Sequence, residues 1–161
     1  SLVPTLSGGH QERGRRAGTE NVAAIAGLGA ACKRLPALLS EQERIAQLRD
    51  RLWDGLAAVD GIQRNGCAEA ALPNTLNVSF PDVEGEAMLM GLDLAGVSVS
   101  SGSACTAGSL EPSHVLMAMG LSGEHARGAV RFSLGTQNTV EEVDEVISRV
   151  LDVVERMRRA A

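Results

Sequence analysis

The residue in this sequence with the clearest chemical potential is Cys105, which stands in a run of serine, glycine and alanine residues. No residue in 98–110 carries a charge, and the small neighbours of Cys105 leave its sulfur sterically open. A thiol reacts as the thiolate, which forms most readily at an exposed cysteine beside a positive group. The segment gives Cys105 access but contains no activating group. On these residues alone, a reactive thiol and an ordinary loop cysteine are both open.

Arg131 is the second candidate, because it is the only charged residue in 128–135. The alternation of this segment predicts a strand with Val130 and Phe132 on one face and with Arg131 and Ser133 on the other. An arginine among apolar residues needs an anion to offset the loss of water, and a guanidinium holds carboxylates through two parallel hydrogen bonds. A substrate carboxylate and a structural Asp or Glu partner are equally open.

A third candidate is the hydroxyl of Thr19, which follows the glycine-rich segment 8–18. This segment holds four glycines and three arginines, and an alanine-rich helix is predicted over 19–34. The first backbone N–H groups of a helix lack partners within the helix and attract phosphate or carboxylate groups. An anion site at Thr19 is therefore open, and so is the simpler function of Thr19 as the cap of the helix.

The remaining cysteines and histidines give no intrinsic metal site. The chain has three cysteines, and their spacing is too wide for a disulfide framework: Cys32, Cys67 and Cys105. No two of them form a CxxC zinc motif. His114 and His125 have no cysteine or histidine at ligand spacing, so we interpret both as surface or capping residues.

Helices and strands are predicted between these candidate residues. Pro36 is expected to end the first helix, and a capping box at 40–43 to open a second helix that connects two domains. The stripe formed by Met88, Leu89 and Leu92 is expected to be core. A half-buried strand is predicted over 72–81, because Leu76, Val78 and Phe80 alternate with Asn77 and Ser79. The further predicted elements are helices over 84–95 and 113–119, and a last helix opened by a capping box at 139–142.

Composition and charge exclude several classes of function. The 161 residues carry a net charge of -5 and 2% aromatic residues, so no nucleic-acid partner is expected. No apolar run is expected to span a membrane. The odd number of widely spaced cysteines favours a reducing, cytoplasmic compartment.

Three long motifs resemble one known family. They are GGHQERGRRAGTEN over 8–21, SSGSACTAGSLEPSHVL over 100–116 and VRFSLG over 130–135. In this order and spacing they resemble the group I cysteine desulfurases, which are pyridoxal-phosphate enzymes of the NifS and IscS type. The long segment of small residues around Cys105 is what indicates group I.

The resemblance implies a fold and a division into domains. The chain is expected to be the C-terminal small α/β domain of a fold-type I pyridoxal-phosphate-dependent transferase, together with the edge of its large domain. Residues 1–38 would be a remnant of the large domain and 39–60 a connecting helix. Residues 61–161 would be the small domain that carries the thiol segment.

The resemblance also implies the roles of the candidate residues. Cys105 would be the catalytic nucleophile that takes sulfur from L-cysteine as a persulfide and leaves L-alanine. Arg131 would bind the substrate carboxylate, and Thr19 would contact the cofactor phosphate in the partner's site of a homodimer. The sulfur would pass to an acceptor or an iron–sulfur scaffold protein, with Cys105 acting at most as a transient iron–sulfur ligand.

The sequence departs from the family pattern at the cofactor lysine. The Ser-x-His-Lys segment of the family is not recognisable, and the only lysine, Lys33, is expected to be a solvated cation near the end of a helix. We therefore expect the chain to be a C-terminal portion that does not turn over cysteine by itself.

Two other functions are open. A binding module could accept persulfide sulfur on Cys105 from a partner and pass it on without cofactor chemistry. Another enzyme of the same fold, such as a selenocysteine lyase or an aminotransferase-like protein, would use Arg131 similarly but would need no thiol in that segment.

Overall fold

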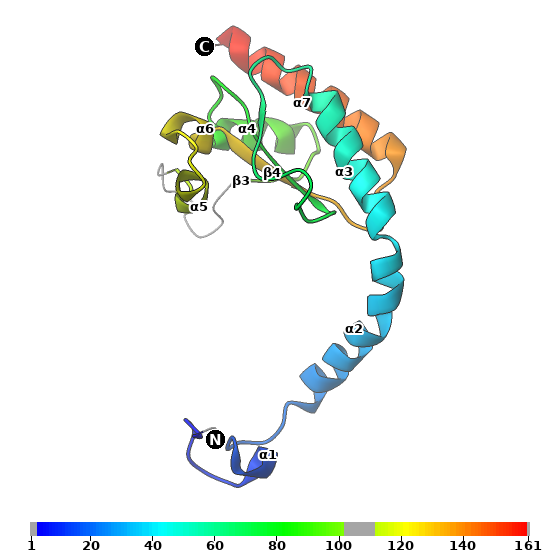
Figure 1. Ribbon diagram of the computed structural model, residues 1–161, viewed down its shortest axis with the longest axis vertical. Helices are drawn as coiled ribbons and strands as arrows, with labels where there is room; N and C mark the ends of the chain where they lie inside the picture. Colours follow the sequence, from blue (N-terminus) through cyan, green and yellow to red (C-terminus); the bar gives the residue numbers. More distant parts are fainter. Residues whose placement is uncertain (1–2, 102–111, 161) are drawn as a thin grey trace. The chain divides into compact units, whose positions relative to one another are not determined.

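The computed structural model describes residues 3–101 and 112–160, and the chain divides into two compact units, 1–40 and 41–161 (Figure 1). The first unit contains the helices α1 (Gln11–Gly14) and α2 (Val22–Ser40). None of the residues 3–40 is buried in the described structure. The second unit contains the sheet and the other helices, so it holds the hydrophobic core.

Helix α2 begins later than the sequence predicts. Its cap is Asn21, whose Oδ1 accepts a hydrogen bond from the N–H of Ala24 at 3.0 Å. The prediction that Thr19 caps this helix is therefore wrong. An amide oxygen at position 21 satisfies a free N–H group of the first turn, so the helix needs no second cap at position 19.

Helix α2 also continues past Pro36, which was predicted to end it. A proline removes one hydrogen bond from a helix, but the neighbouring leucine and alanine residues have high helix propensity and carry the helix to Ser40. Ser40 Oγ donates a hydrogen bond to the carbonyl oxygen of Ala37 at 2.8 Å. The predicted capping box at 40–43 therefore does not form.

The length and composition of α2 correct a further expectation. With 19 residues, α2 is long enough and apolar enough to cross a membrane, judged by length and composition alone. No other helix in the described residues meets both criteria. A helix that is apolar on all sides is usually covered by protein or by lipid. The expectation that no apolar run reaches this length is wrong, because Lys33 and Arg34 are the only charged residues within it.

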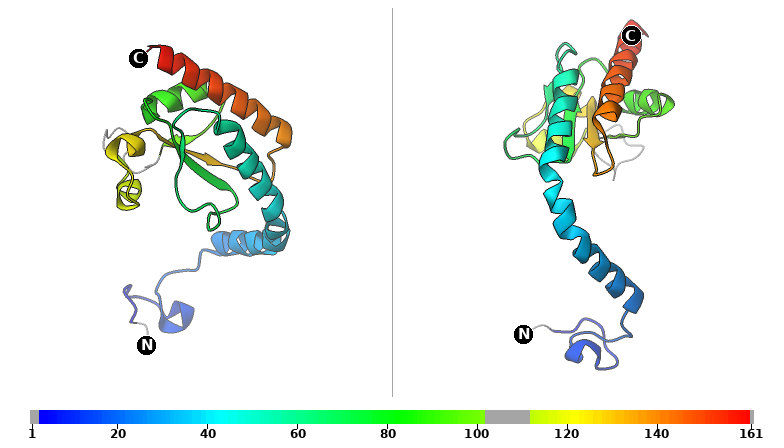
Figure 2. Two further views of the ribbon diagram at one scale, coloured as in Figure 1. Left: turned by 45° about the horizontal axis from the view of Figure 1, so that its top comes forward. Right: turned by 90° about the vertical axis from the view of Figure 1, so that its right-hand side faces the viewer.

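The second unit is built on an antiparallel sheet with the strand order β1-β2-β4-β3 (Figures 1 and 2). The strands are β1 (Gln63–Arg64), β2 (Thr75–Ser79), β3 (Ser100–Ser101) and β4 (Ala129–Ser133). The helices α3 (Gln42–Leu56), α4 (Gly85–Leu94) and α7 (Val140–Ala160) pack on one face of the sheet. The predicted α/β fold is confirmed, and α3 is part of this second unit.

The core lies between the sheet and these three helices. The alternating residues Leu76, Val78 and Phe80 are almost completely buried, as the period of the predicted strand requires. Met88 and Leu92 of α4 are fully buried beside them, and Leu89 is partly buried against the same core, so the prediction that this stripe is core is confirmed.

The other face of the sheet is only partly covered. The short helices α5 (His114–Ala118) and α6 (Gly123–Arg127) place Leu116 and Ala126 against Ala129 at the start of β4. Further along β4, Arg131 and Ser133 are exposed. The face of the sheet that carries Arg131 is therefore open in this unit.

Hydrogen bonds fix the loop that connects β4 to α7. Glu142 N–H donates to Thr139 Oγ1 at 3.2 Å and Thr139 N–H donates to Glu142 Oε2 at 3.1 Å, so the capping box predicted at 139–142 is confirmed. The Arg44 guanidinium donates to the carbonyl oxygens of Thr136 and Asn138 at 2.8 and 2.9 Å. These bonds fix the loop that follows the arginine-bearing strand.

Candidate functional site

Arg131 occupies the middle of β4 and is flanked by a strand on each side. Its register partners are Asn77 of β2 and Ser100 of β3. Val130 and Phe132 are buried on the opposite face, which confirms the predicted division of this strand into two faces. The guanidinium therefore stands on the polar, open side of the sheet.

Arg131 forms no ion pair with any Asp or Glu among the described residues. A structural acidic partner is thus not found in the described part of the chain. The premise that this arginine is surrounded by apolar groups also needs correction, because its side chain is exposed in this unit. An exposed and unpaired guanidinium is available to an incoming carboxylate.

Cys105 lies outside the residues that the structure describes. The described part of the chain ends on one side at Ser101 of β3 and resumes at Pro112, just before α5. The predicted role of Cys105 therefore stays a prediction. What the structure does establish is that the strand leading to this segment is the register neighbour of Arg131.

Thr19 lies in the first unit and is exposed. Since Asn21 caps α2, the Thr19 hydroxyl has no hydrogen-bond partner among the described residues. The preceding loop is ordered by the side chains of Gln11 and Arg16. Gln11 Oε1 accepts from the N–H of Gly18 at 3.2 Å, and Arg16 donates to the carbonyl oxygen of Gly18 at 3.0 Å. The role of Thr19 as an anion contact stays a prediction, without the competing role as a cap.

The two histidines are surface residues. His114 is exposed on α5, whereas His125 Nδ1 lies 2.9 Å from Ser122 Oγ in the cap of α6. Helix α6 itself was not predicted from the sequence. No cluster of three or more possible metal-ligating side chains is present in 3–101 and 112–160.

The free cysteines outside the thiol segment are also exposed. Cys67 Sγ donates to Glu69 Oε2 at 3.0 Å, and this hydrogen bond lowers the pKa of Glu69. Cys32 is exposed on α2. Both thiols serve as internal references for the reactivity of Cys105.

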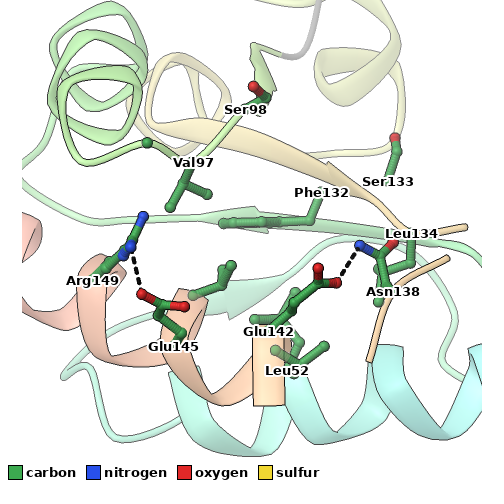
Figure 3. A pocket seen from close by; sticks show the side chains of 13 residues that line it. Leu52, Val97, Ser98, Phe132, Ser133, Leu134, Asn138, Glu142, Glu145 and Arg149 are labelled. Carbon is green, nitrogen blue, oxygen red and sulfur yellow. Dashed lines mark hydrogen bonds and ion pairs between the residues drawn. The ribbon is translucent and has the colours of Figure 1, made fainter. Parts of the chain in front are cut away.

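A pocket of about 470 Å³ opens on the helix-covered side of the sheet, between α7 and β4 (Figure 3). Its charged groups are already partnered, because Arg149 pairs with Glu145 and donates to the carbonyl oxygen of Ala95 at 2.5 Å. Arg131 does not line this pocket. We therefore place the candidate site on the open face of the sheet.

Asn77 is a site residue that the sequence did not single out. The alternation of the predicted strand placed Asn77 on its polar side, but periodicity gives no cross-strand partner. Only the register of β2 with β4 brings it beside Arg131.

The residues of this chain do not fit pyridoxal phosphate as a covalently held cofactor. Thr19 offers a hydroxyl for a phosphate, but Lys33, the only lysine, is exposed on α2 roughly 16 Å along the helix from its first residue. No step that requires the cofactor is assigned to the residues of this chain alone.

The aminotransferase class-V family model matches residues 4–146. The chain belongs to this family of pyridoxal-phosphate enzymes. Within it, the chain is 50% identical over 160 residues to the cysteine desulfurase NifS of Azotobacter vinelandii, and 48% identical over 159 residues to a cysteine desulfurase of Gluconacetobacter diazotrophicus. Each match covers 98% of this chain and 40% of the relative, so the chain spans about two fifths of the length of these relatives.

Solved structures agree with these relatives. A NifS-like protein superposes with a TM-score of 0.81 at 37% identity, over 95% of this chain and 39% of the other. The NifS-like protein of Rickettsia africae gives a TM-score of 0.80 at 34% identity, over 96% and 41%. The resemblance to cysteine desulfurases that the three motifs indicate is confirmed.

Proposed function

We propose that this chain is part of a pyridoxal-phosphate-dependent cysteine desulfurase that converts L-cysteine to L-alanine and holds the removed sulfur as a persulfide on Cys105. The similarity to NifS-type cysteine desulfurases over almost the whole chain supports this activity. The structural observation that carries it is the exposed Arg131, which has no acidic partner among the described residues. Arg131 is in register with Ser100 of β3, the strand that precedes the Cys105 segment.

Arg131 would bind the carboxylate of L-cysteine. Its guanidinium offers two parallel N–H groups to a carboxylate, and the open face of the sheet leaves room for a substrate. Cys105 follows β3 in the sequence, and β3 pairs with the strand that carries Arg131. Binding and sulfur transfer would thus use neighbouring strands.

Cys105 would act as the nucleophile. Its thiolate attacks the substrate sulfur, the carbon–sulfur bond of cysteine breaks and a sulfur–sulfur bond forms. The substrate carbon gains a proton, so that one cysteine and one enzyme thiol give one alanine and one enzyme persulfide. Pyridoxal phosphate, held by the polypeptide that supplies the lysine, would provide the electron sink for breaking the carbon–sulfur bond.

The cofactor lysine would come from polypeptide other than these 161 residues, since Lys33 is their only lysine and does not stand in a Ser-x-His-Lys segment. Thr19 would contribute a phosphate contact across the interface of a homodimer. The persulfide would be delivered to a sulfur-acceptor or iron–sulfur scaffold protein in a reducing compartment.

Complementation tests this function against the persulfide-relay alternative. The chain is incubated with L-cysteine and pyridoxal phosphate, with and without polypeptide that carries the Ser-x-His-Lys segment of the family, and alanine is measured. Alanine formed only by the combination supports the desulfurase. If the combination forms no alanine, and a persulfide-bearing donor protein nevertheless transfers sulfur to the chain, the relay replaces the proposal.

A further inference from the structure

Asn77 lies directly beside Arg131 on the open face of the sheet. The two residues are register partners in the antiparallel pair β2 and β4. Side chains at such opposed positions have Cβ atoms roughly 4.5–5.5 Å apart and point to the same face. Asn77 is half-buried and Arg131 is exposed, so the two side chains are neighbours on this face of the sheet.

Hydrogen bonds from Asn65 fix the orientation of the Asn77 carboxamide. Asn65 Nδ2 donates to Asn77 Oδ1 at 2.6 Å and to Ser79 Oγ at 2.8 Å. The backbone N–H of Asn65 donates to the carbonyl oxygen of Asn77 at 2.9 Å. Ser79 is completely buried, so this network has a rigid base. Asn77 Oδ1 is therefore occupied by a protein donor.

The other end of the carboxamide is unoccupied. Asn77 Nδ2 has no hydrogen-bond partner among the described residues, although it carries two N–H donors. Arg131 likewise has no acidic partner in that part of the chain. Asn77 Nδ2 and the Arg131 guanidinium are thus two neighbouring donor groups, one neutral and one charged, whereas the unpartnered oxygen of the network, Asn65 Oδ1, is buried.

A guanidinium and a carboxamide side by side match the two oxygens of one carboxylate. We propose that Asn77 is a second contact for the substrate carboxylate, with Asn65 as the residue that positions it. This inference rests on the proposed function, because it assigns the carboxylate to L-cysteine.

Two substitutions at Asn77 separate direct contact from a structural role. Asn77→Asp keeps an oxygen for Asn65 Nδ2 to donate to, but places a negative charge beside the substrate carboxylate. Asn77→Ala removes the contact without adding charge. Thr75→Val is the matched control, since Thr75 lies on the same strand and face but pairs with Ser133.

The first measurement is KM and kcat for L-cysteine in the complete, cofactor-loaded enzyme that contains this chain. We expect Asn77→Ala to raise KM about tenfold and Asn77→Asp to raise it a further tenfold or so, with kcat changed by less than about twofold. Thr75→Val should leave both constants near those of the unmodified enzyme. An Asn77→Asp enzyme with an unaltered KM would overturn the inference.

The second measurement does not need turnover. In the 161-residue chain, titration with acetate should shift the NMR signals of the Asn77 side-chain amide and of the Arg131 guanidinium, and Arg131→Gln should abolish both shifts. An Asn77 amide that does not respond overturns the inference, whether or not Arg131 responds. An enzyme that forms no alanine while the Asn77 amide responds would overturn the proposed function and leave the carboxylate site.

Discussion

Ser100 of β3 is paired with Arg131 of β4, so the strand that continues toward Cys105 lies beside the one arginine on the open face of β4. This pairing connects two residues that are far apart in the sequence. It places the proposed carboxylate contact next to the point where the thiol segment begins. The proposed chemistry depends on that proximity, because the attacking sulfur and the bound substrate must meet.

Replacing Arg131 should impair substrate binding without harming the fold. We expect Arg131→Gln to raise KM for L-cysteine roughly 10- to 150-fold in the complete enzyme, because a charged hydrogen-bonded contact is lost. The KM of Arg131→Lys should lie between those of the unmodified enzyme and Arg131→Gln, since lysine keeps the charge but lacks the planar guanidinium. Steady-state kinetics measure this effect.

The stability of the same variants is the control. Arg131 is exposed and has no ion-pair partner in the described part of the chain, so the free energy of unfolding should change by no more than about 0.5 kcal/mol. Strong destabilisation by Arg131→Gln would indicate a structural role and would contradict our interpretation.

The cap of α2 gives a second prediction. Asn21→Ala should weaken the helix by about 1 kcal/mol, because the N–H of Ala24 loses its acceptor. Thr19→Ala should leave the helix content unchanged, because its hydroxyl caps nothing in the described residues. Far-UV circular dichroism of the two variants decides the matter, and equal losses of helicity would show that Thr19 is a cap after all.

The capping box of α7 gives a third prediction. Thr139→Ala should lower the free energy of unfolding by about 1 kcal/mol, because Glu142 N–H loses the Thr139 Oγ1 acceptor. The control is Thr136→Ala, because the backbone carbonyl of Thr136 accepts from Arg44 and its side chain has no hydrogen-bond partner among the described residues. Urea titration of both variants should show the loss for position 139 alone.

Acid should weaken the contact between α3 and α7. Arg51 Nε and Nη2 donate to the carboxylate of Asp144 at 2.6 and 2.8 Å, and these hydrogen bonds lower the pKa of Asp144 below its ordinary value of 3.8. A lowered pKa in the folded state contributes stability above 3.8 that is lost as the pH falls through the folded value.

The matched variant for this effect is Asp144→Asn. The difference in unfolding free energy between the unmodified chain and this variant should be constant at neutral pH and shrink below pH 3.8. High salt should reduce it at every pH, since both side chains are about half exposed. A difference that grows on acidification would contradict the assignment.

The fold was largely predictable wherever a local pattern determines it. The alternation of Leu76, Val78 and Phe80 predicted a half-buried strand, and the box between Thr139 and Glu142 predicted the start of the last helix. In these cases hydrophobic period and capping chemistry agree with the packing.

Sequence patterns failed where two local solutions compete. Ser40 could cap a following helix, yet its hydroxyl bonds backward to Ala37 because α2 passes through Pro36. The helix start at Val22 was missed because Thr19 and Asn21 are both good caps and only the structure shows which is used. Short α6 carries too little periodicity to be recognised.

The candidate site was predictable as residues but not as an arrangement. Motifs singled out Cys105, Arg131 and Thr19, whereas the proximity of Asn77 to Arg131 follows from the strand register. Register is set by contacts between segments that are far apart in the chain, so one strand's alternation cannot supply it. The roles of all three motif residues stay predictions.

The most direct test of the central claim is to locate the sulfur. After the complete enzyme has reacted with L-cysteine, its thiols are alkylated and peptides are mapped by mass spectrometry, with the exposed Cys32 and Cys67 as internal references. We predict a gain of one sulfur atom on the Cys105 peptide alone, and no gain there in Cys105→Ser. Alanine formation with sulfur absent from Cys105, or shared equally with Cys32 and Cys67, would contradict the account.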